Sequence, residues 1–233
     1  MQASQTDAGA GRLEASVAGS VPRKAASELT PWCSSPGKRF FDLVAVSAIL
    51  FAVWPVMLLV AAAIKASSRG PVLFRQKRVG RNGKLFELMK FRSMHLDAEK
   101  RGPGITREND PRIFPLGRRL RKWKLDELPQ LFNVIRGDMT LVGPRPDLPE
   151  FCATLSASQR SILQLKPGVT GAATLAYRQE EQILSAHTGE NIADYYITHI
   201  YPDKARIDLE YAAKAGFMGD IRILSETLRA ILS

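Results

Sequence analysis

The sequence predicts an α+β protein that is mostly helical, with one membrane-embedded helix joined to a compact domain. Three observations predict it: an almost unbroken apolar stretch at 43–64, an Asn-Gly turn between two short apolar runs, and helical spacing of apolar residues through much of the remainder. The 233 residues are 45% hydrophobic and 24% charged, which is enough for one sizeable core.

The charge balance indicates an anionic partner. The net charge of +10 suits nucleic acid, an anionic membrane surface or a phosphorylated substrate. Cys33 and Cys152 stand far apart, so neither a disulfide framework nor a zinc site is expected. The three histidines, His95, His187 and His199, are scattered, and we expect them to be surface or packing residues.

The chain divides into three parts. Residues 1–36 are rich in Ala, Ser, Gly and Pro and are predicted to be a disordered tail. A signal peptide is not expected, because the apolar stretch lies too far from the first residue. Residues 37–67 form the membrane-embedded part, and residues 68–233 form the compact domain.

The apolar stretch from Leu43 to Ile64 has about the 20 residues that a bilayer core requires. Lys38 and Arg39 precede it and would anchor it at the interface, but basic residues also follow it, so charge does not predict its orientation. Pro55 lies near the middle, where it removes a helical hydrogen bond and favours a kink. Both a re-entrant helix and a kinked spanning helix fit this pattern.

A short β-hairpin is predicted next, with the turn at 80–83 between apolar runs at 71–74 and 84–88. The segment 96–115 is polar and contains Gly and Pro, so it is predicted to be a loop. Leu116, Leu120 and Trp123 share one helical face opposite a face of Arg and Lys. The last third is predicted to be helical, and amphipathic helices of this kind suit a membrane interface.

Two adjacent carboxylates, Asp126 and Glu127, follow the basic run 118–124 and precede apolar residues at helical spacing. In phosphate chemistry, one carboxylate can attack phosphorus while the other helps to hold a divalent metal. The alternative is structural, with Asp126 as a helix N-cap and Glu127 as a solvated acid in the first turn.

Taken together, the motifs resemble those of the bacterial sugar transferases, the monotopic phosphoglycosyl transferases that act on polyprenyl phosphate. The resemblance covers residues 38–233 and rests on five blocks in order. The blocks are Lys38-Arg39-Phe40-Phe41-Asp42, Gly70-Pro71-Val72 through Gln76 and Arg78, Lys90-Phe91-Arg92-Ser93-Met94, Leu125-Asp126-Glu127-Leu128-Pro129-Gln130 with Gly143-Pro144-Arg145-Pro146, and Pro167-Gly168-Val169-Thr170-Gly171.

The resemblance implies a reaction. A sugar 1-phosphate would pass from a nucleotide diphosphate sugar, usually a UDP-sugar, to undecaprenyl phosphate, and a nucleoside monophosphate would be released. This step begins the assembly of exopolysaccharide, capsule or lipopolysaccharide repeat units at the cytoplasmic face of the bacterial inner membrane. The implied partners are therefore both substrates and that membrane, with no nucleic acid; a homodimer is left open.

The resemblance also implies residue roles. Asp126 would be the nucleophile that forms a phosphosugar-aspartyl intermediate, and Glu127 would be the ligand of Mg²⁺. The remaining matches are expected to bind substrate or its phosphates, and they are Arg121, Arg145, Lys90, Arg92, Gln76, Arg78, Asp208 and Asp220.

The chain departs from the family pattern at several places. Trp54-Pro55 stands where Ser-Pro is common at the break of the re-entrant helix, so the kink must rest on proline alone. Residues 172–178 differ from the family's short form, which leaves the sugar undetermined. The chain is expected to be a minimal form, without a multi-span N-terminal region. Two other functions remain open: a membrane-tethered metal-dependent phosphohydrolase using the same dyad, and a basic module that binds membrane lipid or nucleic acid.

Overall fold

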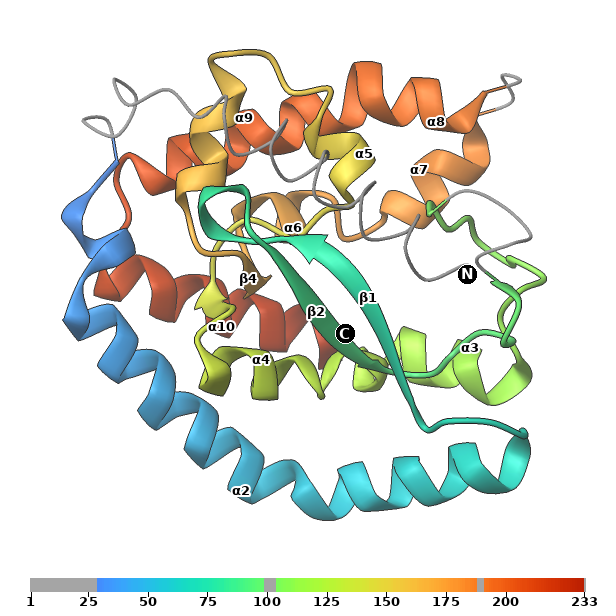
Figure 1. Cartoon of the computed structure of the whole chain (residues 1–233). Coiled ribbons are helices and arrows are strands. Elements are labelled where there is room, and N and C mark those ends of the chain that lie inside the picture. Colours follow the sequence, from blue (N-terminus) through green and yellow to red (C-terminus); the bar gives the residue numbers. More distant parts are fainter. Residues whose placement is uncertain (1–28, 99–103, 188–190, 233) are drawn as a thin grey trace, which may run out of the picture.

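The computed structural model describes residues 29–98, 104–187 and 191–232 (Figure 1). Most of the predicted tail therefore lies outside the described residues. The described helices and strands are α2 (Pro36–Ser67), β1 (Leu73–Val79), β2 (Leu85–Phe91), α3 (Pro115–Lys122), α4 (Gln130–Arg136), β3 (Thr140–Val142), α5 (Pro149–Cys152), β4 (Gly168–Thr170), α6 (Ala172–Ala176), α7 (Glu180–Ala186), α8 (Ile192–Tyr195), α9 (Tyr201–Ala212) and α10 (Phe217–Leu232). Short 3-10 turns lie at Pro31–Ser34, Arg81–Gly83, Leu125–Glu127 and Gln159–Gln164, and a π-helical turn lies at Tyr196–Ile200.

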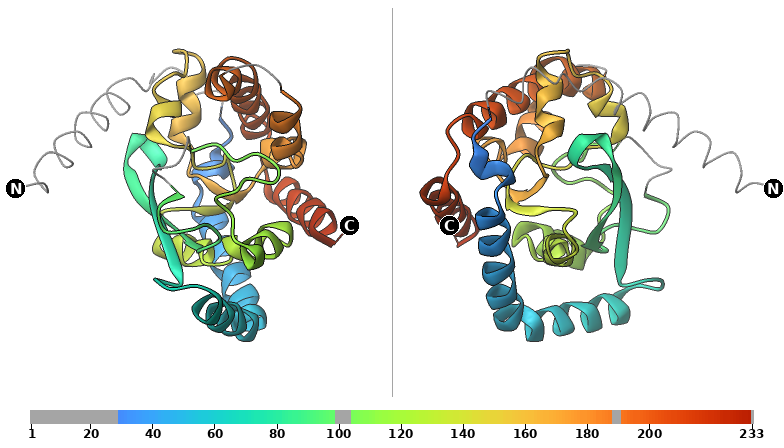
Figure 2. Two further views of the ribbon diagram at one scale, coloured as in Figure 1. Left: turned by 90° about the vertical axis from the view of Figure 1, so that its right-hand side faces the viewer. Right: turned by 60° about the vertical axis from the view of Figure 1, so that its left-hand side comes forward.

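The predicted apolar helix, α2, is one continuous helix of 32 residues. The Ser35 hydroxyl accepts a hydrogen bond from the Lys38 amide at 3.0 Å and caps the first turn. Pro55 lies inside the helix. Figures 1 and 2 show that α2 bends partway along its length. We call the residues before Pro55 the first arm and the residues after it the second arm.

Both arms of α2 pack against the compact domain. In the first arm, Val46 is fully buried in a cluster with Met139 and Leu141. In the second arm, Ile64 is fully buried in a cluster with Leu120 and others. Over the most apolar part of α2 only 11% of the residues are buried, which is unlike the core helix of a soluble protein. The exposed large apolar side chains of α2 are Phe40, Val44, Phe51, Trp54, Val56, Leu58 and Leu59.

Two small sheets hold the segments that carry the motifs. β1 and β2 form the predicted antiparallel hairpin, with Leu73 opposite Phe91 and Val79 opposite Leu85. β3 and β4 pair in parallel, with Thr140 opposite Gly168. The second sheet was not predicted, because each of its strands has only three residues. It joins the Gly-Pro-Arg-Pro block to the Pro-Gly-Val-Thr-Gly block.

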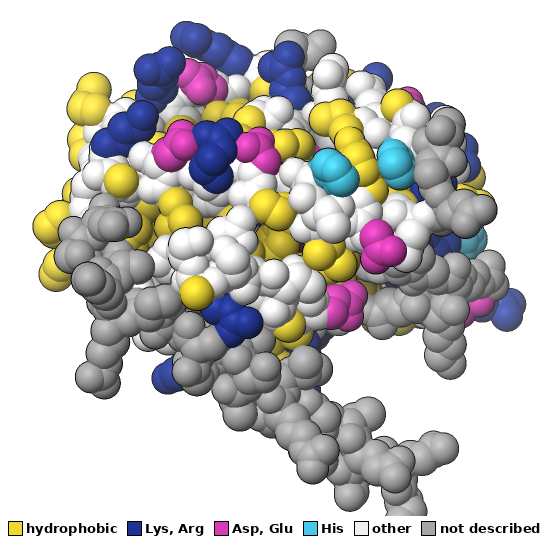
Figure 3. Space-filling view, turned by 90° about the horizontal axis from the view of Figure 1, so that it is seen from above, with side chains coloured by type: hydrophobic (Ala, Val, Ile, Leu, Met, Phe, Trp, Pro, Cys, Tyr) yellow, Lys and Arg dark blue, Asp and Glu magenta, His cyan; other side chains and the backbone are white. Residues whose placement is uncertain are grey.

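The face of the molecule away from the second arm of α2 has a different character. Figure 3 shows Lys, Arg, Asp, Glu and His side chains interspersed with apolar ones across this face. On α9, for example, Arg206 donates to Asp203 at 2.7 Å and to Glu210 at 2.5 Å. Mixed charge of this kind is typical of a water-facing surface.

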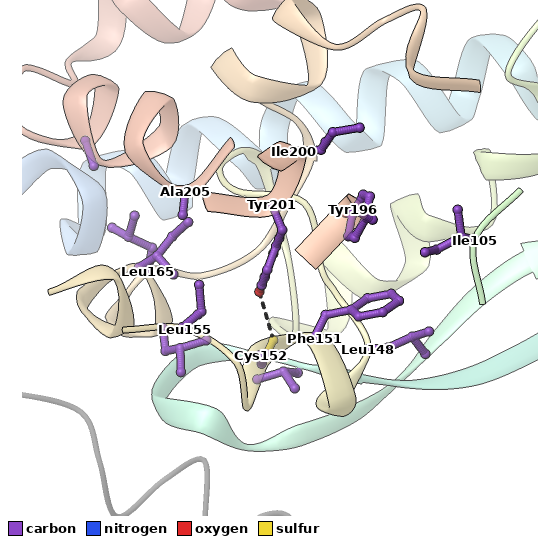
Figure 4. Packing of buried hydrophobic residues seen from close by; sticks show 14 of the residues in the cluster. Ile105, Leu148, Phe151, Cys152, Leu155, Leu165, Tyr196, Ile200, Tyr201 and Ala205 are labelled. Carbon is purple, nitrogen blue, oxygen red and sulfur yellow. Dashed lines mark hydrogen bonds between the residues drawn. The ribbon is translucent and has the colours of Figure 1, made fainter. Parts of the chain in front are cut away.

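The larger core lies between α5, α9 and the turns around them (Figure 4). Phe151 packs against Tyr196 and Tyr201, with ring centroids 5.1 and 6.4 Å apart. The Cys152 sulfur lies 3.3 Å from the Tyr201 hydroxyl, and burial raises the pKa of this thiol to about 12. Cys152 is therefore a packing residue with an unreactive thiol.

The predicted tail extends less far than residue 36. The Thr30 amide donates to the Ala212 carbonyl at 3.1 Å, and the Trp32 indole donates to Asp220 at 3.0 Å. Residues 30–35 therefore belong to the folded part. The mostly helical architecture, with one long apolar helix, a two-stranded hairpin and a compact domain, is confirmed.

Candidate active site

The carboxylate dyad lies in a tight turn between α3 and α4, at the 3-10 turn Leu125–Glu127. Lys124 precedes it in the left-handed region, with φ of 53°. The place of the dyad before apolar residues at helical spacing predicts that it opens a helix, but α4 begins only at Gln130. Leu125 and Leu128 pack against the cluster around Ile64 and Leu120, which fixes the turn to the core.

Three segments distant in sequence meet at Glu127. Lys90, at the end of β2, donates to Glu127 Oε1 at 2.9 Å. Arg145, in the loop after β3, donates to the same oxygen at 2.6 Å and to Oε2 at 3.4 Å. Burial alone would raise the pKa of Glu127, but the two cations outweigh it and hold this pKa well below its usual range. Glu127 is therefore ionised and bound on both oxygens.

Asp126 has the opposite environment. Its side chain is 3% exposed, and its Oδ1 receives no hydrogen bond from any residue that the structure describes. Burial raises the pKa of Asp126, and the adjacent negative charge of Glu127 raises it further. A buried oxygen without a partner costs about 1–3 kcal/mol, and a bound ion or substrate beside Asp126 would supply the missing contact.

Burial also affects the cations of the site. Burial lowers the pKa of Lys90 to about 8, although the negative charge of Glu127 acts to raise this pKa. The carboxylate of Glu127 raises the pKa of Arg145, which therefore stays charged under all ordinary conditions. Together, the two residues form a cationic clamp around Glu127, one a point charge and the other a planar fork.

The loop that carries Arg145 is held by glycines at close approach. The Gly168 amide donates to the Pro144 carbonyl at 2.7 Å, and the Gly143 amide donates to the Thr170 carbonyl at 2.9 Å. A Cβ atom on Gly168 would lie 2.2 Å from the Gly143 nitrogen, so only glycine fits there. The parallel pair of β3 and β4 therefore determines where Arg145 points.

Magnesium fits the chemistry of these donors. Among the described residues, no three His, Cys, Asp or Glu side chains form a metal-binding group. Mg²⁺ usually takes one or two protein carboxylates and completes its shell with water and substrate phosphate. Asp126 offers an oxygen without a partner, and Glu127 is its ionised neighbour. Both carboxylates could therefore hold Mg²⁺ together with a substrate phosphate.

The other predicted substrate residues fall into separate groups. Arg121 forms an ion pair with Glu181 of α7. Arg78 donates to the Gln76 side-chain oxygen at 2.7 Å and to the Pro146 carbonyl at 3.3 Å. Arg78 therefore lies beside the loop that carries Arg145, and Arg121 is near enough to the dyad for its charge to act against the rise in the pKa of Asp126.

Arg92 lies at the end of α2. Its guanidinium donates to the Ser68 carbonyl at 3.0 Å and to the Arg69 carbonyl at 2.5 Å. The structure thus shows Arg92 holding the backbone that directly follows the last residue of α2. Its predicted contact with substrate stays a prediction.

The two remaining aspartates lie behind the arginine loop. Asp208 accepts a hydrogen bond from the Ala173 amide at 2.9 Å, and burial raises its pKa to about 7. Asp220 is fully buried and accepts hydrogen bonds from Lys38, Trp32 and Tyr211. Both line a small internal cavity beside Gly143 and Pro144, so they support the loop from inside the domain. Their predicted contact with substrate also stays a prediction.

Sequence reasoning missed a second buried ionic group next to the arginine loop. Lys204 of α9 is 5% exposed and donates to Glu180 at 2.7 Å and to the Tyr196 hydroxyl at 3.2 Å. Burial raises the pKa of Asp147, which directly follows Arg145-Pro146. Asp147 directly follows the Gly-Pro-Arg-Pro motif, so its position in the sequence could have identified it as a candidate site residue. No such signal marks Lys204 and Glu180, because only the fold places them near the arginine loop.

Comparison with known proteins identifies the family to which this chain is similar. A family model described as bacterial sugar transferase matches residues 33–233. The chain is similar to an undecaprenyl-phosphate glucose phosphotransferase of Komagataeibacter xylinus, with 38% identity over 199 residues, 82% of this chain and 35% of that protein. The chain thus spans about a third of the length of that relative.

Two shorter relatives match over most of their length. A UDP-glucose:undecaprenyl-phosphate glucose-1-phosphate transferase of Caulobacter vibrioides is 34% identical over 209 residues, 84% of this chain and 70% of that protein. EpsL of Bacillus subtilis, named as an uncharacterized sugar transferase, is 34% identical over 195 residues, 84% of this chain and 87% of that protein.

Proposed function

The chain belongs to the bacterial sugar transferase family, and from this premise we propose that it transfers a sugar 1-phosphate from a UDP-sugar to undecaprenyl phosphate. The observation that carries the proposal is the contrast within the dyad, where Glu127 is fully bound while buried Asp126 keeps an oxygen without a partner. The names of the Komagataeibacter and Caulobacter relatives support the acceptor, and they make UDP-glucose the first donor to examine.

In the first step, an oxygen of the Asp126 carboxylate attacks the phosphorus that bears the sugar. A new oxygen–phosphorus bond forms, and the bond from that phosphorus to the bridging oxygen of the diphosphate breaks. The leaving group is UMP, which keeps the bridging oxygen and its electron pair. The product is the phosphosugar-aspartyl intermediate, an acyl phosphate (mixed anhydride) on Asp126. The raised pKa of Asp126 makes its ionised form a stronger nucleophile than an exposed aspartate.

Attack by one anion on another requires positive charge around the phosphates. Lys90 and Arg145 lie next to the dyad and supply it, and the planar fork of Arg145 suits two phosphate oxygens at once. Glu127 would hold Mg²⁺ together with a substrate phosphate, and the ion would supply positive charge against the charge that develops on the leaving group. Arg121 can join them by giving up Glu181.

In the second step, a phosphate oxygen of undecaprenyl phosphate attacks the same phosphorus. The bond to Asp126 breaks, the carboxylate is regenerated, and the lipid now carries a diphosphate-linked sugar. Two separate steps allow a water-soluble donor and a membrane-bound acceptor to use one site in turn. This product would begin a repeat unit of exopolysaccharide, capsule or lipopolysaccharide.

We also propose that α2 is re-entrant, with both ends on the cytoplasmic side of the inner membrane. Its first end is tied to the compact domain by the ion pair between Lys38 and Asp220. Its second end is tied to the same domain by Arg92. A spanning helix would place these ends about 30 Å apart across the bilayer core, where one domain could not hold both.

Exposed apolar side chains on other helices support the same placement. α4 exposes Phe132 and Ile135, and Arg39 of α2 donates to the last carbonyls of α4 at 2.6 and 2.9 Å. α10 exposes Met218 and Leu228. We infer that α4 and α10 lie at the membrane interface beside α2, while the mixed-charge face in Figure 3 meets the cytoplasm.

The reaction is tested with purified full chain in nanodiscs containing Mg²⁺ and undecaprenyl phosphate. A panel of UDP-sugars, with UDP-glucose first, is screened for release of UMP. We expect acceptor-dependent UMP release and, without acceptor, a sugar-phosphate adduct of about one per protein by intact mass. Release of free sugar phosphate without lipid would instead indicate the hydrolase, and no release from any UDP-sugar would contradict the assigned donor class.

The topology is tested with exposed cysteines at the two ends of α2. Ser34→Cys precedes the helix and Lys77→Cys follows it. A membrane-impermeant maleimide applied to sealed inverted vesicles should label both positions. Labelling of one position from each side would contradict the re-entrant placement and favour a spanning helix.

A further inference from the structure

A cavity of about 440 Å³ lies at the second end of α2, outside the dyad. Its lining residues come from the end of α2, the segment after β2 and the segment before α3, and they are Ser68, Arg69, Arg92, Met94, His95, Leu96, Asp97, Pro111 and Phe114. Asp126, Glu127, Lys90 and Arg145 do not line it. The volume falls within the usual range for a small-ligand site.

The polar lining is cationic and partly pre-formed. Arg92 is 4% exposed and is fixed by the Ser68 and Arg69 carbonyls. Gly70 makes this placement available, because its φ is 115° and a Cβ atom there would lie 2.5 Å from Arg92 Nη1. The carboxylate of Asp97 is the single acidic group among the described lining residues.

The position of Arg92 also removes an obstacle to anion binding. The end of a helix carries partial negative charge on its last carbonyls, which repels anions. Arg92 lines the cavity and donates to the Ser68 and Arg69 carbonyls, which directly follow the last residue of α2, so it places a full positive charge beside that end. Arg69 is exposed and forms no ion pair among the described residues, so its guanidinium remains available beside Arg92.

The apolar lining suits a lipid rather than a soluble anion. Met94 and Phe114 line the cavity, and Leu96 lines it while remaining 66% exposed. In Figure 1 this end of α2 lies below α3, on the side of the molecule that we place at the membrane. A phosphate at the arginines would thus leave attached acyl chains next to the apolar face of α2.

We propose that this cavity binds the phosphate headgroup of an anionic membrane phospholipid, which fixes the second end of α2 at the interface. The lipid is not a reactant, because a phosphate held there touches neither carboxylate of the dyad. The proposal goes beyond the transfer reaction and rests on the proposed membrane placement of α2. Arg69 and Arg92 contact the phosphate, and Leu96 contacts the glycerol and first acyl carbons.

The test uses detergent-solubilised full chain titrated with dihexanoyl-phosphatidylglycerol and followed by native mass spectrometry. Arg69→Ala removes a cavity cation, whereas Lys65→Ala removes an exposed cation of the last α2 turn that does not line the cavity. We expect one saturable lipid, bound about tenfold more weakly by Arg69→Ala and unchanged in Lys65→Ala. Arg69→Lys should give an intermediate affinity, because it keeps the charge and loses the fork.

Two further arms separate the sources of phosphate. Dihexanoyl-phosphatidylcholine should bind more weakly, because its choline offsets the phosphate charge. A short-chain polyprenyl phosphate should not displace the phosphatidylglycerol; binding of the polyprenyl phosphate alone would overturn the assignment to bulk phospholipid. No saturable lipid, or equal weakening by Arg69→Ala and Lys65→Ala, would overturn the site itself.

Failure of the proposed membrane placement of α2, or of the transfer reaction, can be measured separately from failure of the lipid site. Flotation of the wild-type chain with phosphatidylcholine liposomes reports membrane association without using the cavity's preference for anionic lipid. Release of UMP reports the transfer reaction. A chain that floats and releases UMP but binds no phosphatidylglycerol contradicts only the lipid site.

Discussion

Two buried ionic clusters in this molecule contain similar residues but have different roles. At the base of α2, Asp220 is fully buried and accepts hydrogen bonds from Lys38, Trp32 and Tyr211. These contacts tie the first arm of α2 and the segment before it to α10. Every charge and donor in this cluster has its partner.

In the turn between α3 and α4, Lys90 and Arg145 likewise surround a buried carboxylate, Glu127. Here the adjacent Asp126 keeps an oxygen without a partner. The difference teaches that burial of charge does not by itself identify a reactive site. The satisfied cluster holds elements together, whereas the unpartnered carboxylate oxygen of Asp126, next to two buried cations, is where we expect chemistry.

Asp126→Asn should have the largest effect on activity. It removes the nucleophile, so UMP release should fall by more than about 10³-fold. The melting temperature in detergent should not fall, because burial already disfavours the Asp126 charge. Retention of near-wild-type turnover would exclude Asp126 as the nucleophile.

Asp220→Ala should affect stability instead. It leaves the Lys38 ammonium buried without a counter-charge, which should cost about 3–5 kcal/mol of unfolding free energy. Glu226→Ala on the same helix breaks the exposed pair with Arg222 and should cost far less, because solvent screens that pair. Thermal unfolding of the solubilised variants measures both, and equal losses would contradict the role of Asp220.

Arg145→Lys should sharpen the comparison within the active site. The charge beside Glu127 is kept, but the fork that meets two oxygens is lost. The loss of a charge-assisted hydrogen bond, about 1.5–3 kcal/mol, predicts a decrease of about 10–100-fold in kcat/KM for the UDP-sugar. Arg107→Lys, at an exposed arginine outside the dyad and its loop, should leave kcat/KM unchanged.

Asp208 should affect the pH dependence of stability. Burial raises its pKa from 3.8 to about 7, so between these values the folded state binds more protons than the unfolded state. The unfolding free energy should therefore fall as pH rises through this window, by at most about 1.4 kcal/mol per pH unit.

Asp208→Asn should remove this decline while its side-chain oxygen still accepts from the Ala173 amide. Asp203, on the same helix, provides a contrast of opposite sign, because hydrogen bonds from Tyr177 and Arg206 lower its pKa. Melting temperatures of wild type and Asp208→Asn between pH 4 and 7 measure the difference. Parallel curves would show that the charge of Asp208 does not oppose folding.

The sequence by itself determined the local features. The unbroken apolar run predicted α2 and Pro55 its bend, because hydropathy and a missing amide act within one helix. The Asn-Gly turn predicted the hairpin of β1 and β2 for a similar reason. The adjacent carboxylates Asp126 and Glu127 stood out because their chemistry depends on being neighbours.

Only the tertiary structure decided which charges meet. In the folded chain Lys90 and Arg145 form ion pairs with Glu127, and Arg121 forms an ion pair with Glu181. Arg92 donates a hydrogen bond to the Ser68 carbonyl after α2. Each of these contacts joins segments well separated in the chain, and a side chain's spacing in sequence carries no information about its distant partner. The three-residue strands β3 and β4 were hidden for the same reason, since their pairing is stabilised by packing across the domain rather than by their own pattern.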